Sequence, residues 1–349
     1  MKKKKKLDYK KEERADLEKI AKDFHFWIPR SDNFPKSKYW FSTGSTLLDL
    51  AVHRDGGGIP SGRIVEISGA ESTGKTVLGA AIGGSCQRQK GIVVLFDVES
   101  TFDYERGKIY GLDPERVLLP EDQPATIEEL FQSIKKVLTE VKAESFCFII
   151  DSIAALETIE ELEASYSDSS YGTERAKKLS RVLRSMPRLL AEKQSTLVFI
   201  NQIRDKLGVQ FGRKDDTPGG RAIKFYASCR IRLNMIQKIK DKSKTVIGID
   251  VESEVIKNKI DRPFLIAKFP IYFADKHGGI DDLESCVSFI RENSDVLGRK
   301  GEWFSFKEYK EQSLVKFLNV LEERKADKEI YSIVKRVWDN VYNCDREGR

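Results

Sequence analysis

The fold is decided by residues 63–76, which read RIVEISGAESTGKT. The last eight residues match the pattern G-x-x-x-x-G-K-[ST] of a phosphate-binding loop at every fixed position. A short apolar run, Arg63–Ser68, precedes the loop and predicts a buried strand. The residues that follow, Thr76–Gln89, have a helical pattern. A chance match would lack this strand and this helix, so the stretch predicts a nucleotide-binding loop.

Each fixed residue of the loop has a chemical task at a nucleotide. The glycines let backbone N–H groups curl around phosphate oxygens, and Lys75 brings a positive charge to the β- and γ-phosphates. The Thr76 hydroxyl ligates Mg²⁺, and the positive end of the following helix faces the anion. The residues predicted to contact the nucleotide here are Gly69, Glu71, Ser72, Thr73, Gly74, Lys75 and Thr76.

A magnesium site at such a loop needs a second carboxylate at the end of a neighbouring strand. The run Phe146–Asp151 has that form, because it is a buried strand that ends in an acid. We interpret Asp151 as the acid that holds Mg²⁺ through a water molecule. The simpler alternative is that Asp151 caps the next helix.

Hydrolysis also needs a group that orients or deprotonates water. Glu99 follows the predicted strand Ile92–Asp97, at the sheet edge where open α/β folds bind ligands. Asp97 competes for this role, and either acid could merely cap a helix. The residues by themselves leave the choice open.

Composition excludes several classes of protein. The chain has 349 residues, of which 40% are hydrophobic and 33% charged, so we expect two or three folded domains rather than a disordered chain. The longest uncharged apolar stretch, Phe146–Ile150, is far too short to span a bilayer, and no membrane partner is expected. Five scattered cysteines without a CxxC motif favour a reducing, cytoplasmic location. The lysine run Lys2–Lys6 is followed by no apolar stretch, so it predicts no secretory signal.

The net charge of +6 is mostly a property of the N-terminal tail. Residues 1–22 contain ten Lys or Arg and five Asp or Glu, which leaves only +1 for the rest of the chain. If the body of the protein binds nucleic acid, it must therefore do so through local basic patches.

The periodicity predicts an α/β core over residues 40–281. Apolar runs at 63–68, 92–97, 146–151 and 196–201 alternate with helical patterns such as 76–89 and 127–142. This alternation predicts a mostly parallel, twisted sheet with helices on both faces. Further runs, at 229–235, 246–255 and 263–271, have no helices between them and predict antiparallel hairpins on that sheet.

Two smaller parts flank this core. Residues 1–39 combine the basic tail with a short helix, in which an apolar stripe of Leu17, Ile20, Ala21 and Phe24 docks on a neighbouring protomer or packs on its own domain. Residues 282–349 predict a small α+β domain with two amphipathic helices.

The chain resembles the bacterial RecA recombinase family. The resemblance is strong over about residues 41–279 and weak over 301–306. It implies a RecA-type P-loop ATPase core with an N-terminal oligomerisation helix. The segments that carry it, in family order, are Ser42–Ser45, Gly62–Ile67, the phosphate-binding loop, Asp151–Leu156, Phe199–Arg204, Lys224–Ser228 and Lys257–Ile260.

The resemblance assigns roles within the ATP site. It implies that Glu99 activates the attacking water and that Gln202 senses the γ-phosphate and signals to an adjoining DNA-binding loop. It places Asp103 at the nucleotide, and it implies that Lys257 and Lys259 reach into the neighbouring subunit's ATP site. Without the family, these two lysines would be read as part of a solvated face. The implied catalytic set is Lys75, Glu99, Gln202, Lys257 and Lys259.

DNA contacts are implied at two loops. One loop, near residues 166–172, leads into the basic segment Thr173–Lys193, which is either a DNA-binding surface or simply a solvated helix. The other loop spans residues 203–220 and combines basic residues, an aromatic and glycines. The residues implied to contact DNA are Lys177, Arg204, Lys206, Phe211, Arg213, Gly219 and Gly220.

The resemblance implies a DNA-dependent ATPase that forms ATP-bound filaments on single-stranded DNA. Such filaments promote homologous pairing and strand exchange in recombination, DNA repair and the SOS response to DNA damage. The implied cofactors are ATP and Mg²⁺, and the implied partners are single-stranded DNA, homologous duplex DNA and further copies of the chain in a helical filament. A single-strand-binding protein or a repressor as a further partner stays unproven.

Two alternatives and two departures accompany this interpretation. The alternatives are a recombination accessory that binds ATP without turnover, and a ring-forming motor or helicase with the RecA fold. Arg106 stands where the family usually has a tyrosine that stacks on adenine, which leaves the nucleotide preference open. The acidic segment Glu157–Glu163 has no assigned role. Such divergence suits a phage- or mobile-element-encoded member of the family.

Overall fold

The computed structural model describes residues 11–26, 36–100, 102–163, 171–205, 215–216, 220–273, 278–298 and 303–342. Contacts divide the chain into two units, Met1–Ser37 and Lys38–Arg349. The first unit holds helix α1 (Lys11–Asp23), and the second holds the other described elements. The predicted boundary between the core and a separate C-terminal domain stays a prediction.

Helix α1 carries the predicted apolar stripe. Leu17 and Ile20 are about half exposed, and Phe24, directly after the helix, is 66% exposed. The first unit contains no other described helix or strand.

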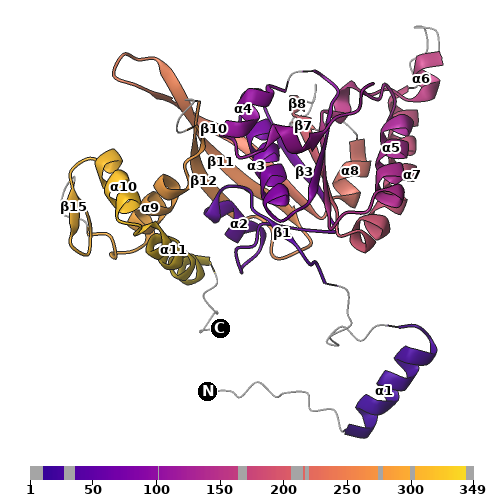
Figure 1. Cartoon of the computed structure of the whole chain (residues 1–349), viewed down its shortest axis with the longest axis horizontal. Helices are drawn as coiled ribbons and strands as arrows, with labels where there is room; N and C mark the ends of the chain where they lie inside the picture. Colours follow the sequence, from indigo (N-terminus) through magenta and orange to yellow (C-terminus); the bar gives the residue numbers. More distant parts are fainter. Residues whose placement is uncertain are drawn as a thin grey trace. The chain divides into compact units, whose positions relative to one another are not determined.

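A nine-stranded sheet forms the centre of the second unit, in the order β13-β12-β11-β10-β3-β7-β6-β4-β5 (Figure 1). The strands from β10 to β5 run parallel, whereas β11, β12 and β13 each pair antiparallel with the preceding strand. This arrangement confirms the predicted mostly parallel sheet with antiparallel hairpins. The strands are β3 (Ile64–Gly69), β4 (Ile92–Asp97), β5 (Val117–Leu118), β6 (Phe146–Asp151), β7 (Thr196–Gln202), β10 (Cys229–Lys240), β11 (Val246–Asn258), β12 (Ile266–Tyr272) and β13 (Gly279–Ile280).

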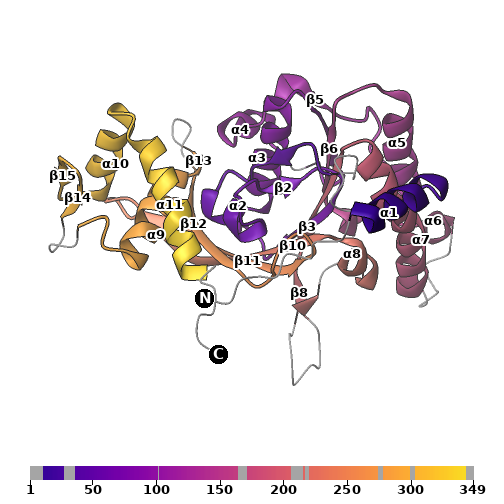
Figure 2. The same ribbon diagram turned by 90° about the horizontal axis from the view of Figure 1, so that it is seen from below.

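Alternate residues of the central strands enter two different cores. Val65 and Ile67 of β3 belong to a cluster with helix α3 (Lys75–Arg88), whereas Ile64 belongs to a second cluster with helices α5 (Ile127–Glu140) and α7 (Tyr171–Glu192). Successive side chains of a strand point to opposite faces, so these strands are buried on both sides. Figure 2 shows α3 and α5 with α7 in separate layers.

The remaining elements connect the sheet or lie at its ends. The helices are α2 (Thr46–Val52), α4 (Tyr104–Ile109), α6 (Ile159–Glu163) and α8 (Gly220–Tyr226), with single 3₁₀ turns at Pro114–Arg116 and Ile153–Ala155. Short strands pair β1 (Trp40–Phe41) with β2 (Ile59–Pro60) and β8 (Arg204–Asp205) with β9 (Asp215–Asp216).

The C-terminal elements share a core with the sheet. Helix α9 packs on β12 and on α11, and the cluster that contains α3 continues into Leu318, Val334 and Trp338. The two predicted amphipathic helices are present. These elements are α9 (Asp282–Asn293), β14 (Phe304–Phe306), β15 (Tyr309–Glu311), α10 (Leu314–Glu323) and α11 (Asp327–Tyr342).

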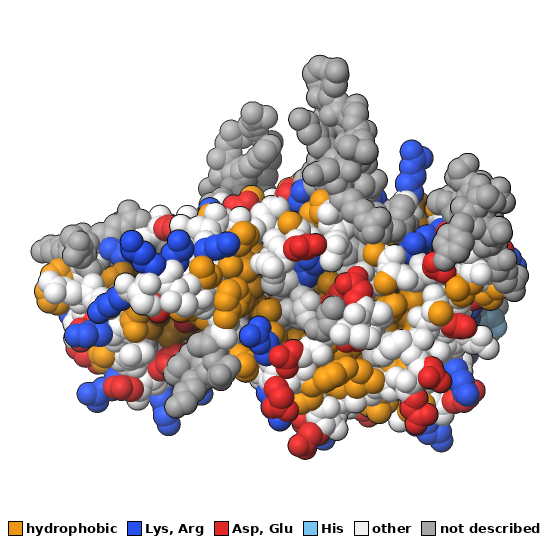
Figure 3. Space-filling model, turned by 90° about the horizontal axis from the view of Figure 1, so that it is seen from above, with side chains coloured by type: hydrophobic (Ala, Val, Ile, Leu, Met, Phe, Trp, Pro, Cys, Tyr) orange, Lys and Arg blue, Asp and Glu red, His pale blue; other side chains and the backbone are white. Residues whose placement is uncertain are grey.

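Strands β10 and β11 extend beyond the sheet as a long hairpin (Figure 1). Lysines crowd its tip, at Lys238, Lys240, Lys242 and Lys244. Figure 3 shows basic side chains gathered toward the side from which this hairpin projects. None of the helices in the described ranges is long and apolar enough to cross a membrane.

Candidate nucleotide and DNA sites

The phosphate-binding loop joins the carboxyl end of β3 to the start of α3, as the motif requires. Gly74 has φ 86°, and a Cβ there would lie 2.3 Å from Cδ1 of Ile271. A Cβ at Gly69 would lie 2.5 Å from Oγ1 of Thr73. The positive φ of Gly74 favours glycine there, and a Cβ at Gly69 would also lie 2.7 Å from the backbone oxygen of Leu233, so both positions favour glycine apart from what a phosphate group needs.

Two side chains of the loop turn inward onto one backbone carbonyl. Lys75 donates from Nζ to the Ala70 oxygen at 2.6 Å, and Thr73 donates to the same oxygen at 2.9 Å. Burial lowers the pKa of Lys75, while Asp151, Glu71 and Glu99 act to raise it. The loop thus holds a cation ready beside its own backbone N–H groups, which is the requirement for binding a polyphosphate.

Thr76 and Asp151, the two residues predicted to hold Mg²⁺, lie in contact. The Thr76 hydroxyl donates to Oδ2 of Asp151 at 2.9 Å. Burial raises the pKa of Asp151 to about 6, with further contributions from Glu99 and Asp97. Hydroxyl and carboxylate oxygens are the ligands that Mg²⁺ prefers, and Mg²⁺ needs only one or two protein ligands when phosphates and waters supply the rest. In the described part of the chain, no group of three acids, histidines or cysteines could hold a metal ion by itself.

The structure separates the two acids that the sequence left as competitors. Asp97 is buried and accepts a hydrogen bond from the Phe102 N–H at 3.0 Å. Glu99 is exposed and accepts a hydrogen bond from the Ser152 hydroxyl at 2.5 Å. Ser152 was missed by sequence reasoning, although its place directly after Asp151 puts it at the same sheet edge.

A pocket of about 480 Å³ lies beside the loop. Asp103 caps helix α4, since its Oδ1 accepts from the Arg106 N–H at 3.1 Å, and the Arg106 guanidinium lies 3.7 Å from Oδ2. Both residues line this pocket, and the contact of Asp103 with a nucleotide stays a prediction. The pocket is lined by Ser72–Val77, Phe102, Asp103, Arg106, Tyr110, Ile249 and Phe273.

Gln202 lies next to the phosphate-binding loop. It ends strand β7 and pairs in register with Gly69 of β3, and the Ile203 N–H donates to the Gly69 oxygen at 3.2 Å. The chain continues into β8 with Arg204, whose backbone pairs with Asp216. Of the other residues implied to contact DNA, Lys206, Phe211, Arg213 and Gly219 lie outside the described residues, and Gly220 begins α8.

Lys177 lines a second pocket, of about 670 Å³, between α7 and α8. Four of the lining side chains are basic, and two are aromatic. Sequence reasoning missed Arg221 and Phe225, because their proximity to α7 is a tertiary contact. The pocket is lined by Ala176, Lys177, Ser180, Arg181, Arg184, Arg221, Ala222, Phe225 and Tyr226.

Two other basic residues of α7 are occupied elsewhere. Lys178 forms ion pairs with Glu160 at 2.5 Å and with Glu128 at 3.1 Å. Arg175 donates to the backbone oxygens of Ile153 and Ala154. Of the acidic segment 157–163, Glu160 thus pairs with Lys178 and neutralises its charge.

Lys257 and Lys259 lie against helix α8 of their own chain. Lys257 is opposite Arg230, which is in register with Glu66, three residues before the end of β3. Its Nζ donates to the backbone oxygens of Lys224 (2.5 Å) and Phe225 (2.9 Å) at the carboxyl end of α8. The structure thus places these lysines against α8, and their reach into a neighbouring subunit's ATP site stays a prediction.

This fold and this site define a nucleotide-binding protein of the P-loop class. The family model described as the RecA N-terminal domain matches residues 18–280. The chain belongs to the RecA family.

Named relatives agree with this assignment. Protein RecA of Rhodopirellula baltica is 41% identical over 265 residues, which cover 76% of this chain and 68% of the relative. Protein RecA of Chlamydia pneumoniae is 36% identical over 302 residues, which cover 86% and 81% of the two chains. A solved structure, the crystal structure of the RadB recombinase, is 21% identical with a TM-score of 0.49, and the match covers 69% of this chain and 98% of that one.

Proposed function

We propose that this RecA-family chain is a DNA-dependent ATPase and recombinase. In this proposal it forms an ATP-bound filament on single-stranded DNA and promotes pairing and strand exchange with homologous duplex DNA in the cytoplasm. The observation that carries the proposal is the register between Gly69 and Gln202, because it joins the phosphate-binding loop directly to the strand that enters the DNA loop.

The ATP phosphates would lie on the loop from Gly69 to Thr76. Lys75 would leave the Ala70 oxygen, 2.6 Å away, for the β- and γ-phosphates. Thr76 and Asp151 fit Mg²⁺ as a direct ligand and as a partner through water, respectively. Bound there, Mg²⁺ would neutralise charge that develops on the phosphate oxygens.

Glu99 is the group proposed to orient and deprotonate the attacking water. It is exposed at the carboxyl end of β4, on the same sheet edge as Asp151. The negative charge of Glu99 acts to raise the pKa of Asp151, which burial raises most. Ser152 donates to it at 2.5 Å and fixes the direction of its carboxylate. A base within one hydrogen bond of a positioned water is what this step requires.

Gln202 is proposed to couple ATP to DNA. Its amide can accept or donate toward a γ-phosphate next to Gly69, and a small shift of the residue would move the segment that begins at Ile203. Ordering of a loop by a γ-phosphate is a known form of switch.

The pocket between α7 and α8 is proposed to hold the DNA backbone. Lys177, Arg184 and Arg221 supply positive charge there, and Phe225 and Tyr226 supply aromatic surface. Basic residues interleaved with aromatics are the usual composition of a single-strand site. Gly220, at the start of α8, gives the backbone close access to a phosphate.

Strand exchange tests this function directly. Purified protein, ATP and Mg²⁺ are added to a single-stranded circle and a homologous linear duplex, and joint molecules are followed on a gel. The proposal predicts joint molecules that require ATP and homology. A heterologous duplex is the control, and product with that duplex, or none with the homologous one, would contradict the proposal.

A further inference from the structure

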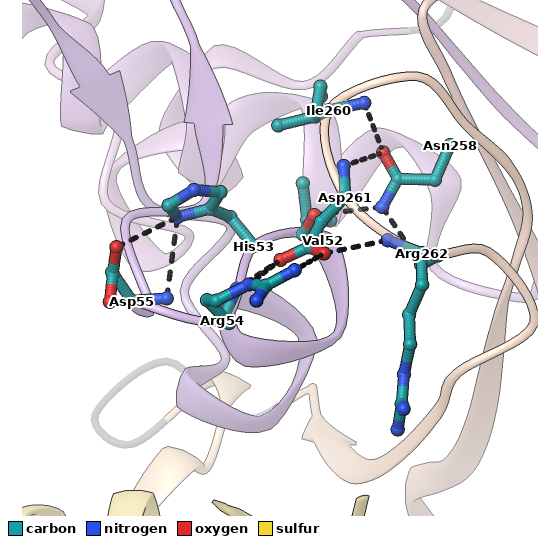
Figure 4. A network of polar contacts seen from close by, with 8 residues as sticks. All are labelled: Val52, His53, Arg54, Asp55, Asn258, Ile260, Asp261 and Arg262. Atoms are coloured by element: carbon teal, nitrogen blue, oxygen red, sulfur yellow. Dashed lines mark hydrogen bonds and ion pairs between the residues drawn. The ribbon is translucent and has the colours of Figure 1, made fainter. Parts of the chain in front are cut away.

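The segment after Lys257 is a loop held from within by Asn258 (Figure 4). Its Oδ1 accepts from the N–H groups of Ile260 (2.9 Å) and Asp261 (3.2 Å). Its Nδ2 donates to the Val52 oxygen at 2.8 Å, at the end of α2. A single side chain thus shapes the loop and attaches it to α2.

A second attachment joins Arg54 to Asp261. The Arg54 side chain donates from Nε to Oδ2 at 2.9 Å and from Nη2 to Oδ1 at 2.6 Å, and its backbone N–H donates to Oδ2 at 3.0 Å. This two-pronged geometry is the strongest form of an arginine–carboxylate pair. Accordingly, the Arg54 hydrogen bonds lower the pKa of Asp261 to about 2.

Helix α2, which precedes Arg54, is buried in the main core. Its residues Leu47, Leu48, Leu50 and Val52 are at most 2% exposed and belong to the main core. Arg54 follows directly after the helix end at His53. The carboxylate of Asp261 is therefore held by a rigid element.

The lysines are held against β10 by their backbone and against α8 by their Nζ groups. The Lys259 N–H donates to the Ser228 oxygen at 2.7 Å, which continues the pairing of β11 with β10. Beyond Asn258, the Phe264 N–H donates to the Val255 oxygen at 2.8 Å and the Val255 N–H donates to the Leu265 oxygen at 3.0 Å, and β12 begins at Ile266, opposite Glu254. The described contacts that tie the intervening loop to α2 are those of Asn258 and Asp261.

We infer that Arg54 and Asp261 are positioning residues that aim Lys257 and Lys259 at the ATP site of the neighbouring subunit. The inference rests on the proposed role of these two lysines. Asp261 is two residues from Lys259, so release of its carboxylate removes one of the two attachments that hold the loop after the lysine to the end of α2. The misplacement of a charge by about 1 Å can lower a rate by up to about 100-fold.

The effect should appear in turnover rather than in ATP binding. In Arg54→Ala, the phosphate-binding loop of the same chain is untouched, so KM for ATP should stay within about twofold, while kcat with saturating single-stranded DNA should fall by roughly 3- to 10-fold. Arg54→Lys keeps the charge without the two-pronged geometry and should give an intermediate kcat. Lys307→Ala, which removes the exposed ion pair to Glu329, is the matched control and should leave kcat unchanged.

A double-variant cycle separates positioning from a general structural role. In a Lys257→Ala/Lys259→Ala background, Arg54→Ala should have no further effect on kcat, because the groups it aims are gone. An equal fall in both backgrounds, or no fall in the wild-type background, would overturn the inference. If the lysine double variant retains wild-type kcat, the trans role fails and the inference with it. Absence of DNA-stimulated turnover in the wild type would instead refute the proposed function.

Discussion

The Thr76 hydroxyl lies 2.9 Å from a carboxylate oxygen of Asp151, and this contact joins two parts of the chain that are 75 residues apart. Strand β7 lies between the strands that deliver the two residues. The parallel strands all end at the same edge of the sheet. Thr76, Asp151, Glu99 and Gln202 therefore all lie along that edge. The proposed hydrolysis of ATP depends on this convergence.

Asp151→Asn should weaken the magnesium site. The amide keeps the size of the side chain and removes the charge, so the affinity for Mg²⁺–ATP should fall by roughly 10- to 100-fold. Titration of a fluorescent ATP analogue with and without Mg²⁺ measures this. Binding without Mg²⁺ should stay unchanged or improve. An equal loss under both conditions would show that Asp151 acts on folding instead.

Glu99→Gln should separate binding from hydrolysis. ATP affinity should remain, while single-turnover hydrolysis should fall by about 10²–10⁴-fold, since the general base is lost. Ser152→Ala should cause a smaller loss, because Glu99 stays and loses only its hydrogen-bond partner. Asp97→Asn is the comparison for the competing acid. If it abolishes hydrolysis and Glu99→Gln does not, the assignment of the base is wrong.

The pocket between α7 and α8 predicts a salt effect on DNA binding. Removal of one phosphate contact by Arg184→Ala should reduce the slope of log K against log salt by about 0.7 for single-stranded DNA. Fluorescence anisotropy at several salt concentrations measures the slope. Lys178→Ala is the control on the same helix, because Lys178 is held by Glu128 and Glu160. A slope that responds equally to both variants would count against this pocket.

Lys257 should lose its proton at an unusually low pH. Burial, with help from Lys259 and Arg230, lowers its pKa to about 8. Between pH 8 and the ordinary lysine pKa of 10.5, the unfolded chain binds more protons, so this group makes the folded state more stable as pH rises through that window. Side-chain NMR of ¹⁵N-labelled free protein, with Lys257→Arg for assignment, should show the titration near pH 8. Titration near 10.5 would contradict the prediction.

The buried ion pair between Arg230 and Glu66 should contribute strongly to the free energy of unfolding. Glu66 is fully buried and is bonded by the Arg230 guanidinium and by Nδ2 of Asn201 at 2.8 Å. Arg230→Met leaves the carboxylate buried without its cation and should lower the free energy of unfolding by about 3–5 kcal/mol. Arg188→Ala, which removes an i,i+4 surface pair to Glu192, should lower it by about 0.5 kcal/mol or less. Urea unfolding of both variants provides the measurement, and similar losses would argue against the buried pair.

The sequence predicted the sheet well because its strands are buried on both faces. Val93 to Phe96 and Cys147 to Ile150 are apolar runs flanked by helical patterns, and such runs leave little choice of structure. The phosphate-binding loop from Gly69 to Thr76 was equally predictable from the sequence, because its chemistry depends on the spacing of neighbouring residues.

Other parts of the site depend on contacts that no local pattern contains. Arg54 and Asp261 are 207 residues apart, and nothing near either residue indicates the other. The same holds for Arg221 and Phe225, which meet α7 only through the packing of α8. Glu160, in the acidic segment 157–163, likewise forms an ion pair with Lys178 that no local sequence pattern indicates.

The ATPase rate with and without single-stranded DNA tests the central claim most directly. The account predicts slow hydrolysis by the protein alone, strong stimulation by single-stranded DNA, and loss of the stimulated rate in Lys75→Ala. A rate that DNA does not change, or stimulated turnover that survives Lys75→Ala, would contradict it.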